Sequence, residues 1–248
     1  MGQFYFDGFE EKWVSFEPVL TVVYNFQPGR SGQAARDFLG NWQGKLVCDD
    51  YSGYKAGFVQ GITEVGCWAH ARRQFHELLE RNQSEIAEKA LSYIGALYDI
   101  ERQAKTLTAA DRLLLRQNKV KPIIGALHRW LIQQRDGLAN STRTANAIDY
   151  RLKRWATLTR YLDDGRLPID NNWVENQIRP WALGRKNWLF AGSLRSGQRA
   201  ANVMTLIQSA KINNIDPQAY LRDVLERLPM AKQSDLEAML PHNWKPAV

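Results

Sequence analysis

The middle of the chain carries helical patterns only. From about Ser84 to Leu162, apolar residues recur at the spacing of one face of an α-helix. The successive apolar stripes consist of Ile86, Ala90, Ile94, Leu97 and Tyr98, then of Ile123, Ile124, Leu127, Trp130 and Leu131, and then of Ile148, Leu152, Trp155, Leu158 and Leu162. An apolar stripe is buried against a neighbouring element. We therefore predict a block of packed helices between two other parts of the chain.

The part before this block is predicted to alternate strands and helices. The β-branched and aromatic run 19–26 is typical of a strand, which the following Pro and Gly residues end. We expect a helix next, ended by Gly44, with an apolar face of Ala34, Ala35, Phe38, Leu39 and Trp42. Short strands over 45–48 and 62–67 and a helical run 68–75 complete an α/β pattern.

The part after the block begins where Asp163-Asp164-Gly165 ends the last helix. A turn-rich run, 167–172, then leads into a helix that carries Glu175. Asp216 and Pro217 have the residue types that begin a helix, and the apolar face that follows consists of Tyr220, Leu221, Val224, Leu225 and Leu228. Residues 234–248 are predicted to form a short tail.

The composition is that of a soluble globular protein. The 248 residues are 44% hydrophobic and 24% charged, which excludes a disordered tail, a collagen-like fibre and a heptad rod. Cys48 and Cys67 cannot form a disulfide framework, and no charged and apolar leader opens the chain. No apolar run approaches the roughly 20 residues of a membrane-spanning helix. We therefore expect a cytoplasmic protein without membrane contact.

The positive charge is concentrated in one segment. The net charge is +7, yet the stretch from Asn176 to Asn213 has no acidic residue. Its basic residues are Arg179, Arg185, Lys186, Arg195, Arg199 and Lys211, interleaved with Trp181, Asn187 and Trp188. Guanidinium groups, backbone amides and stacking aromatic rings are what a DNA backbone contact requires. The alternative is a solvated basic face with tryptophans in the core.

Two carboxylates occupy positions suited to phosphoryl transfer. Such chemistry on a nucleic acid uses carboxylates that hold divalent cations around the scissile phosphate. Mg²⁺ prefers oxygen ligands, and acids at the end of a strand and on a facing helix make a suitable cage. Asp49 follows the strand 45–48, and Glu175 lies on the helix after 167–172.

Both carboxylates also have purely structural interpretations. Asp49 and Asp50 are residue types common at a polar strand end. Asn172 and Glu175 have the spacing of a capping box, and Glu175 and Arg179 have the spacing of an i,i+4 ion pair. Local helix energetics therefore provide an alternative explanation for Glu175.

The run Cys67-Trp-Ala-His70 holds two metal-binding residue types three positions apart. A structural zinc site takes four ligands, and the chain has four His and two Cys in total. A Cys–His nucleophile is disfavoured because no orienting group or oxyanion donor is evident. We therefore interpret Cys67 as a buried thiol and His70 as a histidine hydrogen-bonded within the core.

Five ordered motifs together resemble the transposases of the insertion-sequence-66 family. They are QPGRSG at 27–32, DDYSGY at 49–54, CWAHARR at 67–73, IDNNWVENQIRP at 169–180 and GRKNWLFAGS at 184–193. The resemblance runs from about residue 18 to the C-terminus. It implies an α/β fold with a ribonuclease-H-like core, interrupted by an all-helical insertion and incomplete at its first strand.

The resemblance assigns roles to individual residues. It implies that Asp49 is the second Asp and Glu175 the Glu of an Asp-Asp-Glu triad, both binding Mg²⁺, with Mn²⁺ as a substitute. Cys67 and His70 would form a structural motif. The residues expected to bind DNA are Arg179, Arg185, Lys186, Asn187, Trp188 and Arg199.

The resemblance also divides the chain into regions. Residues 1–81 are expected to form the first part of the core and 82–165 the helical insertion. Residues 166–228 would complete the core with the Glu helix and the basic segment, and 229–248 would form a C-terminal tail element. The family's first Asp lies upstream of where the resemblance begins, and Asp7 is only a weak substitute for it.

The function that follows is that of an insertion-sequence transposase. Mg²⁺-dependent strand cleavage and transfer would act on element ends and target DNA, in a nucleoid-associated protein that also contacts transposase subunits or accessory element proteins. Because the first Asp lies outside the resemblance, we expect a truncated copy. The alternatives are a catalytically inactive DNA-binding or transposase-interaction fragment, and a helical interaction protein with an incidental basic face.

Overall fold

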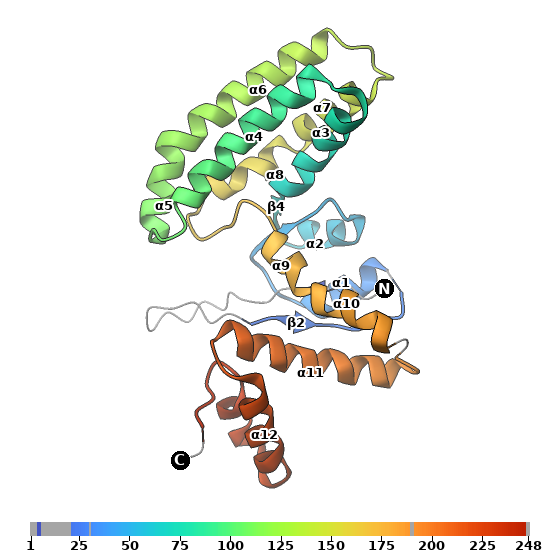
Figure 1. Ribbon diagram of the computed structural model, residues 1–248, viewed down its shortest axis with the longest axis vertical. Helices are drawn as coiled ribbons and strands as arrows, with labels where there is room; N and C mark the ends of the chain where they lie inside the picture. Colours follow the sequence, from blue (N-terminus) through green and yellow to red (C-terminus); the bar gives the residue numbers. More distant parts are fainter. Residues whose placement is uncertain (1–3, 6–20, 30, 189–190, 247–248) are drawn as a thin grey trace. The chain divides into compact units, whose positions relative to one another are not determined.

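The computed structural model describes residues 4–5, 21–29, 31–188 and 191–246 (Figure 1). These residues divide into two compact units. The helical unit comprises residues 43–51 and 57–173, and the terminal unit comprises the described residues within 1–42, 52–56 and 174–248. Among the described residues, no helix combines the length and the hydrophobicity that crossing a bilayer requires.

A pair of parallel strands lies in the helical unit. Strand β3 (Lys45–Cys48) pairs with β4 (Thr63–Gly66), and Cys48 lies opposite Gly66. The strands predicted over 45–48 and 62–67 are thereby confirmed. Between them, the chain forms a 3-10 turn, η1 (Ser52–Tyr54), and the short helix α2 (Lys55–Val59). Val65 on β4 is fully buried, which joins the strand pair to the core of the helices.

The predicted helical block is confirmed and packs around one hydrophobic core. The long helices are α3 (Trp68–Asn82), α4 (Glu85–Gln103), α6 (Lys121–Asp136) and α7 (Arg143–Lys153). In Figure 1, α4 and α6 run side by side along most of their length. The first two stripes face the core as predicted, with Ile94 and Leu127 almost completely buried. Ser84 starts α4 by accepting a hydrogen bond from the Ala87 amide.

The third stripe is not one helix. Helix α7 ends at Lys153, and the stripe continues in α8 (Trp155–Thr159) and the 3-10 helix η3 (Arg160–Asp163). Arg154 lies between α7 and α8 with φ −102° and ψ 11°, which is outside the helical region. Leu158 and Leu162 remain buried despite the break, because short helical pieces can present the same apolar face.

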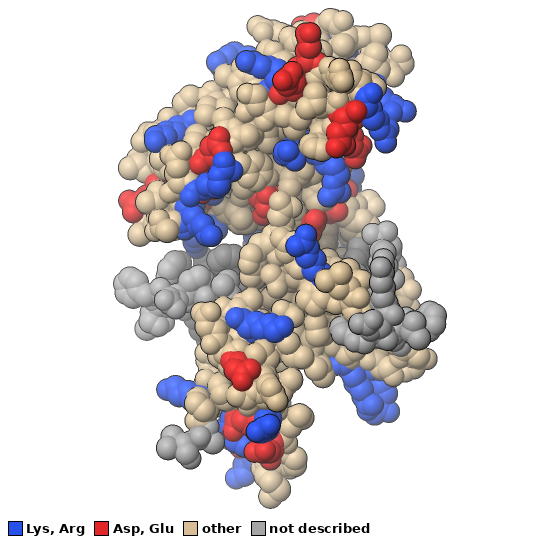
Figure 2. All heavy atoms as spheres, in the orientation of Figure 1, with Lys and Arg blue, Asp and Glu red and all other residues tan. Residues whose placement is uncertain are grey.

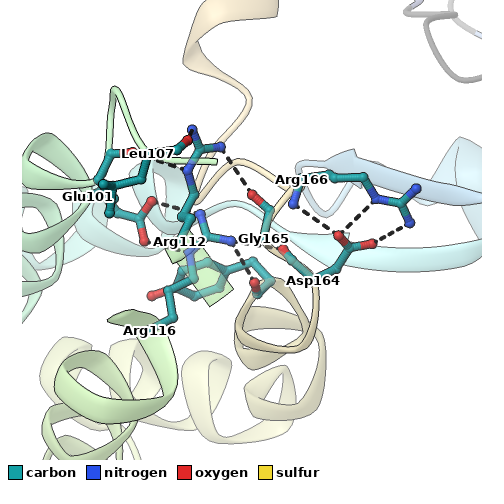
Figure 3. A network of polar contacts seen from close by, with 9 residues as sticks. Glu101, Leu107, Arg112, Arg116, Asp164, Gly165 and Arg166 are labelled. Carbon is teal, nitrogen blue, oxygen red and sulfur yellow. Dashed lines mark hydrogen bonds and ion pairs between the residues drawn. The ribbon is translucent and has the colours of Figure 1, made fainter. Parts of the chain in front are cut away.

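A buried arginine fixes the turn at which the chain leaves the helical block. Helix α5 (Ala109–Leu115) continues into a π-helix, η2 (Arg116–Val120). Arg116 pairs with both carboxylate oxygens of Glu101 at 2.8 and 2.7 Å. It also donates to the carbonyls of Tyr161 and Asp164, each at 2.9 Å. Figure 3 shows this network around the turn, which also receives a hydrogen bond from Arg112 at Gly165.

The terminal unit contains an antiparallel strand pair and the helices of the C-terminal half. Strand β1 (Phe4–Tyr5) pairs with β2 (Val23–Tyr24), and Val19 and Leu20 of the predicted strand lie outside the described residues. The helices are α1 (Gly32–Leu39), α9 (Asn172–Gln177), which begins in the helical unit, α10 (Arg179–Trp188), α11 (Leu194–Ile212) and α12 (Pro217–Arg227).

The predicted end of the first helix is wrong. Gly40, not Gly44, ends α1, and its φ of +53° lies in a region that glycine enters without a steric penalty. Trp42 consequently lies beyond the helix. Gly44 instead accepts a hydrogen bond from the Thr63 amide at the start of the β3–β4 pair.

Helix α12 begins at the residues that the sequence predicts, and the predicted tail packs onto this helix. Asp216 accepts a hydrogen bond from the Gln218 amide at the start of α12. The Tyr220 hydroxyl donates to the Met239 carbonyl at 2.8 Å, and the Tyr220 and Trp244 rings meet edge to face. The four predicted regions and the ribonuclease-H-like fold class stay predictions.

Candidate active site

Asp49 is the first residue after β3, and its carboxylate is half-buried. One of its oxygens, Oδ1, accepts a hydrogen bond from the Tyr51 amide at 3.2 Å. Within the described part of the chain, Asp49 has no ion pair. The neighbouring Asp50 is paired with Arg154, which also binds Glu64 at 2.6 Å. Of the two adjacent acids, Asp49 is therefore the one whose charge is left for a cation.

The chain that leads to Glu175 runs beside the end of the same strand pair. Cys67 and Trp68 directly follow β4. The Trp68 amide donates to the Ile169 carbonyl at 3.1 Å, and the Asn171 amide donates to the Cys67 thiol. Because Cys48 pairs with Gly66, Asp49 and the segment 169–171 lie at the same, carboxyl end of β3 and β4.

Asp170 organises the start of the Glu helix α9. Its Oδ1 accepts a hydrogen bond from the Asn172 amide at 3.0 Å, as the side chain of an Asx turn does. Its Oδ2 accepts from the Asn172 side chain at 3.0 Å and from the Tyr98 hydroxyl at 2.6 Å. The side chain that binds the Asn172 amide is therefore that of Asp170, whereas a capping box would have the Glu175 side chain bind this amide.

Tyr98 is held as a neutral phenol. Burial, and then its hydrogen bond to the Asp170 carboxylate, raise the pKa of Tyr98 far above the ordinary value. The hydroxyl consequently remains protonated, and a donor, at neutral pH. Tyr98 belongs to α4, so a residue of the helical block contacts the start of the Glu helix.

Glu175 lies in the first turn of α9 and is half-buried. Helix α9 begins in the helical unit, which also contains Asp49, and continues into the terminal unit, which contains Glu175. It ends at Gln177, and Arg179 begins the separate helix α10. The alternative explanation of Glu175 as half of an i,i+4 pair therefore lacks the continuous helix that it assumes.

The Cys67–His70 motif forms a partly buried contact. The Cys67 sulfur and His70 Nδ1 are 3.2 Å apart, and Cys67 directly precedes α3. Burial raises the pKa of the Cys67 thiol to about 11, so it is not an activated nucleophile. The Trp68 indole donates to the Leu158 carbonyl at 2.8 Å. Cys67 is buried, as interpreted, and lies within hydrogen-bonding distance of His70, which is half-buried and not part of the core.

The basic segment is partly described. Arg179 is exposed at the start of α10, and Arg195 and Arg199 are exposed on α11. Trp181 instead packs its ring against Tyr24, with centroids 6.3 Å apart. Arg185, Lys186, Asn187 and Trp188 form the last turns of α10, but their side chains lie outside what the structure describes. Asp7 also lies outside the described residues.

The charges of the helical block differ from those of the basic segment. On the face shown in Figure 2, Lys and Arg are interspersed with Asp and Glu over the helical block. Residues 176–213 have no acid to offset their basic side chains. The described face of α11 is therefore better suited to a polyanion than that of the helical block.

The residues at Asp49 have the chemistry that Mg²⁺ requires. The half-buried carboxylate has one described hydrogen-bond donor and no described cation, which leaves oxygen lone pairs available. Among the described residues, no group of three His, Cys, Asp or Glu side chains gathers around one point. Asp49 thus fits as a single ligand, to be completed by other groups.

Sequence reasoning missed two participants at this site. Asp170 had a recognisable signal, because an Asp two residues before a helix start is a frequent Asx turn. Tyr98 had no such signal, since it belongs to an apolar stripe and its partner is 72 residues away. Only the packing of α4 against the segment 167–171 brings the two together.

The chain matches two family descriptions in succession. Residues 12–199 match "Transposase IS66 family", and residues 205–242 match "IS66 C-terminal element". No solved structure matches the chain.

Relatives occur in Sinorhizobium fredii (strain NBRC 101917 / NGR234). The uncharacterized protein y4hP is 38% identical over 243 residues, which are 91% of this chain and 44% of y4hP. The uncharacterized protein y4qI is 37% identical over 91% of this chain and 43% of its own length. The uncharacterized protein y4jD is 34% identical over 90% of this chain and 46% of its own length. The chain spans less than half the length of these relatives, and it belongs to the IS66 transposase family.

Proposed function

We propose that this chain forms the catalytic part of an insertion-sequence transposase, which cleaves and transfers DNA strands with Mg²⁺ or Mn²⁺. One observation carries the proposal. The unpaired carboxylate of Asp49 and the start of the Glu175 helix lie at the same end of β3 and β4. We further propose that these strands belong to a ribonuclease-H-like core into which the helical block is inserted. Family membership supports both statements.

The proposed chemistry needs few groups from the protein. Asp49 and Glu175 would hold Mg²⁺, which when bound lowers the pKa of the attacking hydroxyl and neutralises charge on the scissile phosphate. A water molecule would attack phosphorus at the element end and displace the DNA 3′-oxygen, which leaves as a 3′-hydroxyl. This 3′-hydroxyl would then attack a target phosphate and displace the 3′-oxygen of the target strand, without a covalent enzyme intermediate. Asp170 takes no cation in this scheme, because its carboxylate already accepts from Tyr98 and Asn172.

The proposed DNA contacts come from the acid-free segment. Arg179 and Arg199 are exposed and would bind phosphates of the element ends and the target, together with Arg185, Lys186, Asn187 and Trp188. A nucleoid-associated location and contacts with transposase subunits or accessory element proteins belong to the same proposal.

Substitution of the two carboxylates tests the catalytic roles. Asp49→Asn and Glu175→Gln are each expected to reduce Mg²⁺-dependent cleavage of terminal-repeat DNA by more than ~100-fold. This exceeds the loss typical of a residue that only orients a metal ligand. Single-turnover cleavage in Mg²⁺ and in Mn²⁺ is the measurement. DNA affinity should stay within about 2-fold, since neither side chain is expected to bind phosphate directly.

Asp50→Asn is the matched control for Asp49. It removes an adjacent carboxylate of the same size whose charge is already paired with Arg154. Cleavage should continue, and the loss of stability should not exceed about 1 kcal/mol, because the Asp50 side chain is 32% exposed. Equal cleavage by the Asp49 and Asp50 variants would reject the catalytic role of Asp49.

The competing function is DNA binding without catalysis, favoured by the exposed arginines of α11 in a segment without acids. It predicts salt-sensitive DNA binding by the wild type and no cleavage with either metal ion. A helical interaction protein, by contrast, would show no salt-sensitive DNA binding. The same two measurements therefore separate all three functions.

A further inference from the structure

Helix α9 cannot set its own geometry. It has six residues, none of them buried, whereas an isolated helix is marginal in water below about 12 residues. Figure 1 shows it as a short segment that leads into α10. Contacts with other elements must therefore help to hold α9 in place, and two of them are made at its ends.

The N-terminal end is held from the helical block. Tyr98 donates to Asp170 Oδ2 at 2.6 Å, while the two Asp170 oxygens accept from the amide and the side chain of Asn172. The phenol thus fixes the rotamer of the carboxylate that starts the helix. This pair is partly buried, so water competes less for the hydrogen bond than at the surface.

The C-terminal end is held from β2. The Tyr24 hydroxyl donates to the carbonyl of Gln177, the last residue of α9, at 2.5 Å. Tyr24 is only 2% exposed, and burial raises its pKa to about 12, so the hydroxyl stays a donor. The Tyr24 amide is itself bound to the Thr205 hydroxyl at 2.9 Å. The phenol therefore projects from a strand that α11 holds in place.

We propose that Tyr98 and Tyr24 are positioning residues that fix the two ends of α9 and thereby aim the Glu175 carboxylate. This rests on the proposed catalytic function of Glu175. The proposal gives the inserted helices a part in holding the start of the Glu helix, because α4 supplies Tyr98. A purely structural role is the competing explanation, in which each phenol contributes one hydrogen bond to stability and nothing to catalysis.

Phenylalanine variants of the full chain test whether the helix is held. In Tyr98→Phe and Tyr24→Phe, amide hydrogen exchange over residues 172–178 should accelerate by about 10-fold or more. Tyr93→Phe is the control on α4, since no described hydrogen bond uses its hydroxyl. Tyr220→Phe is the control in the terminal unit, because it loses a buried bond to the Met239 carbonyl. Neither control should change exchange over 172–178.

Catalysis tests whether holding the helix matters. At saturating DNA, the single-turnover rate of the two test variants should fall ~10- to 100-fold, as expected for a misplaced catalytic group. The Mg²⁺ concentration for half-maximal rate should rise several-fold, with DNA affinity unchanged. A loss of general stability would not shift the Mg²⁺ dependence, so this readout separates positioning from folding.

A second variant keeps the test decisive if one tyrosine substitution destabilises the fold. Asp170→Ala removes the acceptor, and the double variant with Tyr98→Phe should be no slower than the slower single variant, because the two groups act as a pair. Additive losses would overturn the pairing of Tyr98 with Asp170. Unchanged exchange over 172–178, or faster exchange with an unchanged rate and Mg²⁺ dependence, would overturn the positioning proposal.

Failure of the proposed function gives a different result. If the wild type does not cleave DNA with Mg²⁺ or Mn²⁺, the catalytic proposal falls and the positioning role falls with it. The exchange data would then still report whether the two tyrosines hold α9, so the two failures are distinguishable.

Discussion

At the scale of single residues, Asp164 shows how β3 is joined to the end of the helical block within one unit. Its carboxylate binds Arg166 through Nη2 and Nε at 3.0 and 3.1 Å, and Lys45 at 2.7 Å. The Arg166 hydrogen bonds, assisted by Lys45, hold the pKa of Asp164 far below its usual range, although burial opposes the shift. Lys45 is the first residue of β3. Its ion pair with Asp164 therefore joins the strand to the turn at which the chain leaves the helical block, which we call the return turn.

This pKa shift predicts acid sensitivity. Because the folded-state pKa is lowered, the contribution of Asp164 to stability is complete above its unfolded pKa of about 3.9 and is lost as the pH falls below that value. The free energy of unfolding of Asp164→Asn should lie below that of the wild type at pH 5–7, and the two should converge on acidification. Urea unfolding at several pH values measures this.

Asp163→Asn is the matched control for Asp164, since Asp163 is exposed and has no described partner. Its unfolding curves should coincide with the wild type at each pH. A gap between wild type and Asp164→Asn that widens below pH 4 would contradict the assignment.

At the scale of elements, the π-helix η2 and the turn that it holds determine where the chain leaves the helical block. The buried Arg116 binds both Glu101 and two carbonyls of the return segment 161–164. Gly165 is required at this turn, because a Cβ there would overlap the carbonyl oxygen of Ala109 on α5. The segment that leads to α9 is therefore fixed by close packing as well as by polar contacts.

Two glycine substitutions test the packing of the return turn. Gly165→Ala should lower the thermal midpoint by several degrees or more, because α5 must shift to accommodate the methyl group. Gly95→Ala in α4 should raise it, since nothing lies within 4 Å of its added Cβ and alanine favours a helix by ~0.5–1 kcal/mol. Thermal unfolding followed by circular dichroism measures both, and a midpoint unchanged in Gly165→Ala would refute the close approach to α5.

The elements show how far the sequence predicts this fold. The strands over 45–48 and 62–67 and the first two helical stripes were predictable, because each is a continuous run of one period. The end of α1 at Gly40 and not at Gly44 could not be predicted. Both are glycines after an apolar face, and only tertiary packing decides which of them adopts a positive φ. The break at Arg154 was also hidden, because the apolar spacing continues across it.

The candidate site was predictable only in part. Asp49 and Glu175 could be proposed from their places after a strand and on a helix. The pairing of Asp50 with Arg154 and of Asp170 with Tyr98 depends on contacts over 104 and 72 residues. No local pattern encodes such contacts, so the sequence alone could not choose between Asp49 and Asp50 on physical grounds.

At the scale of the whole molecule, the net charge of +7 predicts that DNA binding depends on salt concentration. Replacement of Arg195 and Arg199, both exposed on α11, by alanine should weaken DNA binding and reduce the salt slope of log K by about 2. Titrations at several salt concentrations measure this. The control is Lys121→Ala with Arg129→Ala on α6, exposed residues of the helical block, which should leave the slope unchanged.

The contact between α11 and β2 has a consequence for solubility. The Ser209 hydroxyl binds both the amide and the carbonyl of Val22, and the Thr205 hydroxyl binds the next amide along that edge, at Tyr24. A bare strand edge recruits strands from other molecules and seeds aggregation. Here two helix side chains take the place of a neighbouring strand, so the amides of Val22 and Tyr24 are not available to pair with a strand of another molecule.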